Sequence, residues 1–363
     1  KATEVSGLRV GRVGRAGSRS PEPESDATRR SVAVLLAVLL ATAAAYSNSL
    51  GGGFVLDARA LILLNPSVQA ATWENLRDLL TQDYWQPFGA GGLYRPATTL
   101  SYLFNFAVLG NGEQPFGYHA LNLAVHLACT SLVYVLALVV IGQAWTALAA
   151  AALFGLHPIA TEAVTYIAGR ADLLAALGAL AVLVLHASGA TGLAGLLVIA
   201  AAAALGFFAK ESALVLPVLM LAHDVFVGPR PGARSRYTTV LLVLAVYVVA
   251  RLGLAQAELP AAVTPPLDNP LVAVGPLAAR LTALSVAGRQ IALLAWPAAL
   301  SADYSCCEIP VLSWPPSAGD AARLGLVLAG VLAVAVSLHR GRRSHPARCF
   351  FAAAVDVERL IQQ

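Results

Sequence analysis

The sequence carries few ionisable residues, and most of them gather at the ends of long apolar runs. The first is Asp57, in Gly53-Phe-Val-Leu-Asp57, directly after the first apolar run. A carboxylate at such a position can take a proton from a hydroxyl group, and nearby basic side chains can hold a phosphate. The residues that could do this chemistry are Asp57, Arg95, His119, His157, Glu162, Arg170, Asp172, Lys210, Glu211 and Asp303.

Each of these residues also has a purely structural interpretation. Asp57 could cap the turn after Gly51-Gly-Gly53, and Arg95 could anchor its loop by pairing with a carboxylate. Arg170 and Asp172 could form a salt bridge at the start of a helix. Lys210-Glu211 could be a solvated hairpin tip. His119 and His126 lie seven residues apart on one helix face, and one of them is expected to be a core histidine.

Several common sites are missing from the sequence. It has no G-x-x-x-x-G-K-[ST] loop, no G-x-G-x-x-G entering a helix and no H-E-x-x-H. The four cysteines, Cys129, Cys306, Cys307 and Cys349, follow neither a disulfide framework nor a zinc pattern. The basic residues lie in short segments without interleaved aromatic residues, so we predict no nucleic-acid partner. We assign no metal site and no cofactor, and we leave a divalent cation open.

Composition predicts the class of protein that positions these residues. The chain of 363 residues is 58% hydrophobic and only 12% charged, with a mean hydropathy of +0.70. Soluble domains carry about 25% charged residues, so this chain cannot cover a surface that faces water. Several runs approach the ~20 apolar residues needed to cross a bilayer. We predict an all-α, polytopic helical membrane protein.

The expected order along the chain begins with a disordered, basic cytoplasmic tail at 1–30 and a first span at 31–46. A structured extracytoplasmic loop follows at 47–117, with a short helix over Thr72–Leu80 and an amphipathic piece over Ala97–Leu109. The other apolar segments that span or nearly span are 118–141, 144–156, 173–187, 193–208, 213–227, 238–254 and 324–338.

Charge and parity set the predicted topology. The basic segments 229–236 and 339–343 belong on the cytoplasmic side, and 341–363 is a short basic cytoplasmic end. The stretch 276–298 holds Arg289 and Gln290 near its centre, which are costly in hydrocarbon, so we predict an interfacial helix there. About eight spans result, with both ends of the chain inside and the 31–340 region as one transmembrane domain.

A set of motifs, taken in order, resembles one known family. The motifs are Phe54-Val-Leu-Asp-Ala-Arg-Ala-Leu-Ile62 with Asn65-Pro66, Tyr94-Arg-Pro96, Pro115-Phe-Gly-Tyr-His119 with Asn122 and His126, Leu156-His-Pro-Ile-Ala-Thr-Glu-Ala-Val164, Gly169-Arg-Ala-Asp-Leu-Leu174, Ala209-Lys-Glu-Ser212 and Leu300-Ser-Ala-Asp-Tyr-Ser305. Over roughly 45–340 the chain is similar to the membrane part of the transmembrane and tetratricopeptide-repeat O-mannosyltransferases and their bacterial relatives, which are glycosyltransferases of the GT-C fold.

The resemblance implies transfer of a hexose, mannose in eukaryotic members, from a polyprenyl or dolichyl phosphate to Ser or Thr hydroxyls of a protein. It implies a multi-pass protein of a bacterial or endoplasmic reticulum membrane, in contact with membrane lipid and active on the extracytoplasmic or lumenal face. Asp57 maps onto the catalytic acidic motif. The expected donor-phosphate ligands are Arg95, His157, Arg170 and Lys210, and the expected orienting or acceptor-side residues are His119, Glu162, Asp172, Glu211, Asp303 and Tyr304.

Two departures from the family pattern support a rival hypothesis. The family usually shows two adjacent acidic residues in the first loop, whereas this chain has Asp57-Ala58, and no 34-residue repeat follows Arg343. A catalytically inactive membrane subunit that binds lipid or a protein partner is therefore the alternative. A lipid-linked sugar transporter is disfavoured, because the cytoplasmic halves of the expected spans offer almost no polar residues. The sequence does not predict an oligomeric state.

Overall fold

The structure, a computed structural model, describes residues 24–89, 92–257, 270–298, 300–301 and 309–341. Most of these residues lie in helices, and no strand occurs among them. The α-helices are α1 Glu24–Tyr46, α2 Trp73–Thr81, α3 Pro96–Leu103, α4 Phe116–Ile141, α5 Ala144–Leu156, α6 Thr161–Thr165, α7 Arg170–Ala187, α8 Gly192–Ala209, α9 Leu216–Phe226, α10 Ala233–Ala257, α11 Pro276–Ala295 and α12 Ala318–Gly341. The all-α prediction is confirmed.

Short 3-10 and π segments join the helices where the chain turns. They are η1 Ser47–Gly51, η2 Arg59–Leu63, η3 Pro66–Val68, η4 Phe104–Val108, η5 Pro158–Ala160, η6 Ile167–Gly169, η7 Glu211–Val215 and η8 Pro270–Ala273. Most of them fall between the first span and α4, or between α5 and α9. These two regions hold nearly all of the predicted site residues, so the site is built largely from short, tightly turned segments.

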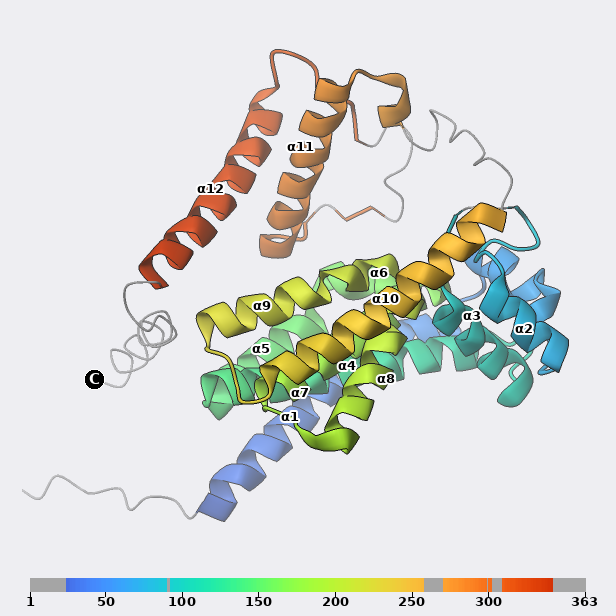
Figure 1. The fold of residues 1–363 in the computed structure, drawn as a ribbon, viewed down its shortest axis with the longest axis horizontal. Coiled ribbons are helices and arrows are strands. Elements are labelled where there is room, and N and C mark those ends of the chain that lie inside the picture. Colours follow the sequence, from blue (N-terminus) through green and yellow to red (C-terminus); the bar gives the residue numbers. More distant parts are fainter. Residues whose placement is uncertain (1–23, 90–91, 258–269, 299, 302–308, 342–363) are drawn as a thin grey trace, which may run out of the picture.

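The long helices pack as one bundle with α7 near its centre. α7 contacts α4, α8 and α9, while α5 packs between α1 and α4. Figure 1 shows α2 and α3 at one end of this bundle, and α11 with α12 as a separate helical hairpin beside it. Because α7 is the most enclosed of the long apolar helices, its N-terminal residues are well placed to fix the loops at that end.

The loop that follows the first span is folded. α2 begins after Thr72, whose hydroxyl accepts a hydrogen bond from the Asn75 amide at 3.2 Å, as a capping residue should. α3 begins with Pro96 in its first turn, where a missing N–H costs nothing. The predicted helix at 72–80 and the amphipathic piece at 97–109 are therefore confirmed, the second as α3 followed by η4.

Seven helices are long and apolar enough to cross a membrane, and an eighth candidate is the bent pair Ala144–Leu156 and Pro158–Thr165, whose axes differ by 44°. The predicted number of about eight spans is close to this number, but the helices that qualify are not all the predicted ones. α9 has only 11 residues, or ~16 Å, so it is too short to be a span by itself. η7 and α9 together nevertheless lead from Lys210, which pairs with Asp172 at the start of α7, to Asp224, which pairs with His186 near the end of α7, so the span at 213–227 stays a prediction. α11 meets the length and composition for a span, and its placement at the interface stays a prediction.

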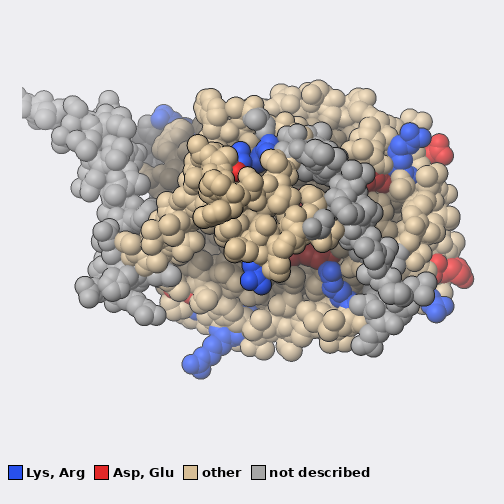
Figure 2. Space-filling view, turned by 90° about the horizontal axis from the view of Figure 1, so that it is seen from above, with Lys and Arg blue, Asp and Glu red and all other residues tan. Residues whose placement is uncertain are grey.

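The surface of the molecule suits a lipid environment. Figure 2 shows a face covered mainly by uncharged residues, with few basic and acidic side chains. None of the span window in α12 is buried, and it exposes Leu328, Val331 and Leu332 among other apolar side chains. An exposed helix that is apolar on every side is favourable only in hydrocarbon. The prediction of an integral multi-pass membrane protein is confirmed at this level.

Some expectations lie partly or wholly outside the described residues. The predicted tail at 1–30 is wrong for its last part, because α1 already begins at Glu24. Residues 1–23 and 342–363 are not described, so the rest of that tail and the predicted C-terminal end are not tested. Asp303 and Tyr304 also lie outside the described residues, as do Cys306 and Cys307.

The close approach of α7 and α8 gives a first test. A Cβ on Gly178 would lie 2.5 Å from the Ala202 carbonyl oxygen and 2.6 Å from the Gly206 nitrogen. We expect Gly178→Ala to force the two helices apart and to cost at least ~1–3 kcal/mol, which a lower thermal midpoint in detergent would report. Gly253→Ala is the matched control, because no atom lies within 4 Å of its added Cβ. Equal midpoints for both variants would contradict this packing.

Candidate active site at the loop end of the bundle

Arg170, the first residue of α7, ties the loop end of the bundle together. Its Nε donates to Asn122 Oδ1 at 2.8 Å, and one terminal nitrogen donates to Asn105 Oδ1 at 2.6 Å and to the Ser101 carbonyl at 3.1 Å. The other terminal nitrogen donates to the Tyr118 carbonyl at 2.9 Å. A single guanidinium therefore joins α3, η4, α4 and α7.

This network corrects one predicted role. Arg170 has no exposed surface, and its carbon Cζ lies 5.2 Å from the ring centre of Tyr102 and 5.6 Å from that of Tyr118. The prediction that Arg170 binds the donor phosphate is wrong, because neutral oxygens and aromatic faces already enclose the guanidinium. The structural alternative for Arg170, a salt bridge to Asp172, is also not realised. Arg170 is a scaffold residue.

Asp57 lies at a strained turn. Leu56 is the one non-glycine residue with a positive φ (48°) in the described part of the chain, and such a conformation costs of order 1–3 kcal/mol. The Asp57 amide donates to the Tyr166 hydroxyl at 2.9 Å, and the Asp57 residue itself is exposed. The backbone of Asp57 is thus held while its carboxylate faces the outside.

Ala58 points the opposite way. It is fully buried and belongs to an apolar cluster with Leu61, Ile62 and Tyr102. A carboxylate at this position would have to enter the cluster, where an unpaired charge is costly. The structure therefore gives the second position of the family's acidic pair a packing role in this chain.

Three tyrosines connect Asp57 to Arg95. Burial raises the pKa of Tyr84 and of Tyr102, the Asp57 carboxylate raises both further, and Arg95 opposes these shifts. Burial and Asp57 also raise the pKa of Tyr166. The tyrosines are therefore neutral at pH 7, and Asp57 and Arg95 have opposite effects on the pKa of the same two phenols, Tyr84 and Tyr102.

Arg95 lies over the Tyr84 ring, with its Cζ 5.1 Å from the ring centre, and it belongs to a group of alternating charges. We call this group the charged cluster: Arg95, Asp172, Lys210, Glu211 and Arg251. Glu211 accepts from Arg95 at 2.8 Å and from Arg251 at 3.0 Å. Lys210 is 2.7 Å from Asp172. The interpretation of Lys210-Glu211 as a solvated hairpin tip is therefore wrong, because both side chains pair with other helices and loops.

Sequence reasoning missed Arg251. It lies near the end of α10, inside an expected span, and it also donates to the Gly92 carbonyl at 3.0 Å. A cation close to the end of an apolar helix was the available signal, because ionisable residues near membrane spans usually have a functional or structural role. Tyr84, Tyr102 and Tyr166 were also missed, because a tyrosine in a loop carries no pattern by itself.

The two predicted histidines have structural surroundings. His157 accepts from the Ile159 amide through Nδ1 at 3.2 Å and donates through Nε2 to the Leu294 carbonyl at 3.1 Å. Both ring nitrogens are used, so His157 has a structural role here, and its binding of phosphate stays a prediction. His119 is 2% exposed, and neither ring nitrogen has a hydrogen-bond partner. His126 bonds the Gly155 carbonyl at 3.0 Å and is the core histidine of the pair.

A cavity of about 560 Å³ opens next to the Asp57 turn. Val55 and Leu56 form one wall, Glu162 of α6 and Tyr166 directly after α6 form a second, and Gln290 and Leu293 of α11 form a third. The structure thus brings Glu162 to the same region as Asp57, whereas Asp172 and Glu211 belong to the charged cluster.

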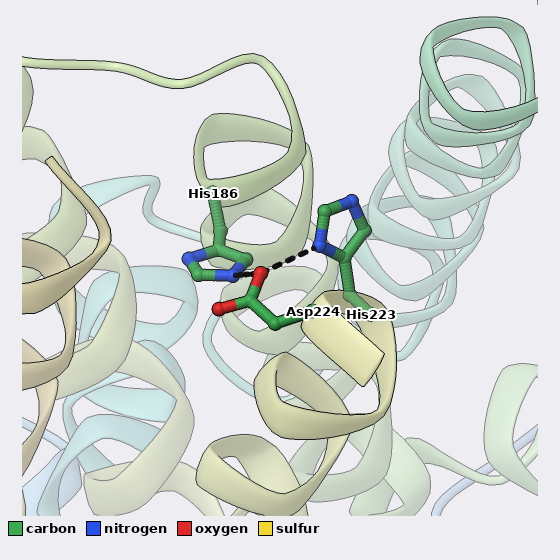
Figure 3. A group of neighbouring side chains, drawn as sticks. All are labelled: His186, His223 and Asp224. Carbon is green, nitrogen blue, oxygen red and sulfur yellow. Dashed lines mark hydrogen bonds and ion pairs between the residues drawn. The ribbon is translucent and has the colours of Figure 1, made fainter. Parts of the chain in front are cut away.

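A separate group lies at the other end of α7. His186 Nε2 is 2.8 Å and His223 Nδ1 is 3.0 Å from Asp224 Oδ1 (Figure 3), and these are residues that could hold a metal ion. However, Arg236 Nε donates to His186 Nδ1 at 3.3 Å. That contact leaves the proton of His186 on Nε2, which faces Asp224, so the arrangement fits a hydrogen-bonded helix junction better than a metal site.

The helices and this loop end define an integral multi-pass membrane protein with a charged extramembrane site. Protein O-mannosyl-transferase Tmtc2 of Drosophila melanogaster is 32% identical over 312 residues, which is 79% of this chain and 32% of that protein. Drosophila melanogaster Tmtc1 is 42% identical over 132 residues, covering 35% of this chain and 15% of that protein. Human TMTC2 is 34% identical over 139 residues, covering 37% and 16%.

The resemblance of the chain to the TMTC family of protein O-mannosyl-transferases, which its motifs predicted, is confirmed by these relatives over 79% of the chain. It spans about a third of the length of Tmtc2 and less of the other two relatives. No family model matches the chain, and no solved structure matches it.

The Arg170 network predicts a loss of stability. Arg170→Met leaves the carbonyls of Ser101 and Tyr118 and two asparagine oxygens without their donor, at ~1–3 kcal/mol for each that stays buried and unpaired. We expect the thermal midpoint in detergent to fall by on the order of 5–10 °C. Arg77→Met, at an exposed position of α2, is the control. An unchanged midpoint for Arg170→Met would show that the network does not hold the loop end.

The ion pairs of Glu211 predict that the stability of the folded protein decreases at acidic pH. Partial burial alone would raise its pKa, but the hydrogen bond and charge of Arg95, together with Arg251, outweigh burial and lower the pKa. The charged form therefore stabilises the folded state above the unfolded pKa of about 4.3, and this contribution disappears as the pH falls through the lower folded-state value. We expect the thermal midpoint of wild type to fall over this window more steeply than that of Glu211→Gln. Parallel curves would contradict the ion pairing.

Proposed function

We propose that this protein transfers a hexose, mannose by analogy with the names of its relatives, from a polyprenyl or dolichyl phosphate to Ser or Thr hydroxyls of a protein. The observation that carries the proposal is Asp57, exposed on a strained turn whose amide is held by Tyr166. Arg95 of the charged cluster lies over the Tyr84 ring, with its Cζ 5.1 Å from the ring centre, and Asp57 and Arg95 have opposite effects on the pKa of Tyr84 and of Tyr102. A base beside cations is what this transfer needs.

The proposed reaction exchanges one bond at the sugar. The acceptor hydroxyl attacks the anomeric carbon as its proton passes to the Asp57 carboxylate. The bond between that carbon and the phosphate oxygen breaks, and the electron pair leaves with the polyprenyl phosphate. Asp57 then releases its proton to water. The reaction is balanced without an oxidant or a reductant.

The donor phosphate is assigned to Arg95, Lys210 and Arg251. Their present partners are the carboxylates of Glu211 and Asp172 at 2.7–3.0 Å. These carboxylates hold the cations in place in the absence of donor and limit repulsion between them. An incoming phosphate shares the cations with Glu211 and Asp172, and the charge that develops on the leaving phosphate is stabilised by groups that are already in position. We assign no resident metal or cofactor to this step.

The side of the membrane follows from the basic residues. Arg230 and Arg236 bond carbonyls near the C-terminal end of α7, at Ala187 and Ala190, whereas the charged cluster lies at the N-terminal end of α7. Basic loops are enriched on the cytoplasmic side. We therefore place the Arg230–Arg236 end in the cytoplasm and the charged cluster on the extracytoplasmic or lumenal side.

A catalytically inactive membrane subunit is the second candidate. The buried Ala58 favours it, because the family's usual second acid has no counterpart at the adjacent position. Such a subunit would keep the bundle and the charged cluster for lipid or partner binding but would not transfer sugar.

Replacement of the proposed base separates the two candidates. We expect membranes that contain wild-type protein to transfer mannose from a polyprenyl-phosphate donor to an acceptor polypeptide. Asp57→Asn should lower this rate by about 10²–10⁴-fold, the usual contribution of a general base, while donor binding persists.

The control is Glu113→Gln, an exposed carboxylate in the same loop, which should keep the wild-type rate. Full activity of Asp57→Asn would overturn the assignment of Asp57. Wild-type protein that binds the donor but transfers no sugar to any acceptor would support the inactive subunit.

A further inference from the structure

Tyr166 contacts both helix α4 and the Asp57 turn. Its carbonyl accepts a hydrogen bond from Asn122 Nδ2 at 3.0 Å and another from the Gly169 amide at 3.0 Å. Its own amide donates to the Glu162 carbonyl at 3.1 Å. Both backbone groups of Tyr166 are therefore bonded to neighbouring helices and turns, and its phenol is left to act on the Asp57 turn.

The ring of Tyr166 is held as well as its backbone. It packs against the apolar cluster that contains the buried Ala58, which directly follows Asp57 in the chain. A tyrosine side chain has only two χ torsions, so a packed ring on a bonded backbone leaves its hydroxyl little freedom. The hydroxyl of Tyr166 is therefore in place before any substrate binds.

The strained turn presents the backbone of Asp57 to this hydroxyl. Leu56 has a φ of 48°, and the amides of Ala58 and Arg59 bond carbonyls within the turn. The Asp57 amide instead donates to the Tyr166 hydroxyl at 2.9 Å. Strain of this kind persists where the surrounding structure fixes it, and it gathers at functional sites. The turn and the phenol together therefore fix the backbone of the proposed base.

The same phenol can also act on the side chain of Asp57. A hydroxyl oxygen that accepts one hydrogen bond can still donate its own proton, and the Asp57 amide uses only the oxygen. Burial raises the pKa of Tyr166 most, and the Asp57 carboxylate raises it further, both by its charge and by a hydrogen bond with the phenol. The phenol is therefore protonated at pH 7 and close enough to the carboxylate to donate to it.

We propose that Tyr166 is a positioning residue for Asp57, because its hydroxyl holds the backbone amide of the base and donates its proton in a hydrogen bond to the carboxylate. The proposal rests on the proposed transferase function. In the transfer step the proton of the acceptor hydroxyl still passes to Asp57, and Tyr166 keeps its own proton. A donated hydrogen bond favours the charged form of a carboxylate, so Tyr166 both aims the base and keeps it ready to accept a proton.

Tyr166→Phe tests this role, because it removes only the hydroxyl and keeps the ring in the apolar cluster. We expect kcat for mannose transfer from a polyprenyl-phosphate donor to an acceptor polypeptide to fall by about 10–100-fold, since the base is no longer held in place. The KM for the lipid donor should stay constant. The acidic limb of the pH–rate profile should move to higher pH by about one unit, because the charged carboxylate loses a hydrogen-bond donor.

Tyr118→Phe is the matched control. The Tyr118 hydroxyl donates to the Gly112 carbonyl at 2.9 Å, so this variant also loses one hydrogen bond between a tyrosine and the backbone of the loop. It should keep the acidic limb of the wild type. Thermal midpoints in detergent show whether both variants are folded at the assay temperature, so a loss of folded protein is not mistaken for a loss of positioning.

A second replacement tests the same hydrogen bond in the opposite direction. 3-Fluorotyrosine at position 166 keeps the hydroxyl and makes it a stronger donor, because fluorine makes the phenol more acidic. The acidic limb should then move to lower pH than in the wild type. A purely structural role for Tyr166 predicts no shift in either direction.

The outcomes also separate this proposal from the function on which it rests. If wild-type protein transfers no sugar to any acceptor polypeptide, the proposed function fails, and the role of Tyr166 fails with it. If transfer occurs and Tyr166→Phe keeps the wild-type kcat or the wild-type acidic limb, the function stands and the positioning role of Tyr166 is refuted.

Discussion

A single buried guanidinium sets the geometry of the loop end. Arg170 opens α7, the most enclosed of the long apolar helices, and donates to groups of α3, η4 and α4. A cation with no exposed surface is tolerated only when its donors are satisfied. The loop segments that carry these acceptors are therefore held at fixed positions, and Asn122, one of the acceptors, also donates to the Tyr166 carbonyl at 3.0 Å.

The hydrogen-bond network of Arg170 also helps to position the residues around Asp57. Through Tyr166 this network reaches the amide of Asp57, and Asp57 and Arg95 have opposite effects on the pKa of Tyr84 and of Tyr102. The cations then pair with Asp172 and Glu211 in a setting that is only partly exposed to water. Ion pairs of this kind keep several positive charges together before a phosphate binds, whereas Asp57 is exposed.

The sequence was most informative where the signal is local. The Thr72 cap, the start of α7 at Arg170 and the all-α membrane class follow from patterns within a few residues or from composition. The roles of Arg170 and His157 could not be predicted, because their partners lie 48–69 and 137 residues away in the chain. The length of α9 was also misjudged, since an apolar run does not show that η7 interrupts it. Arg251 has a role only because folding brings it to Glu211.

The central claim is that the charged cluster holds the phosphate of a lipid-linked sugar, and co-purified lipid tests it most directly. Mass spectrometry of protein extracted in mild detergent should find a polyprenyl phosphate, or its sugar-linked form, on the wild type and much less on Arg95→Gln. Ordinary phospholipid alone on the wild type, or equal polyprenyl phosphate on both proteins, would contradict the claim.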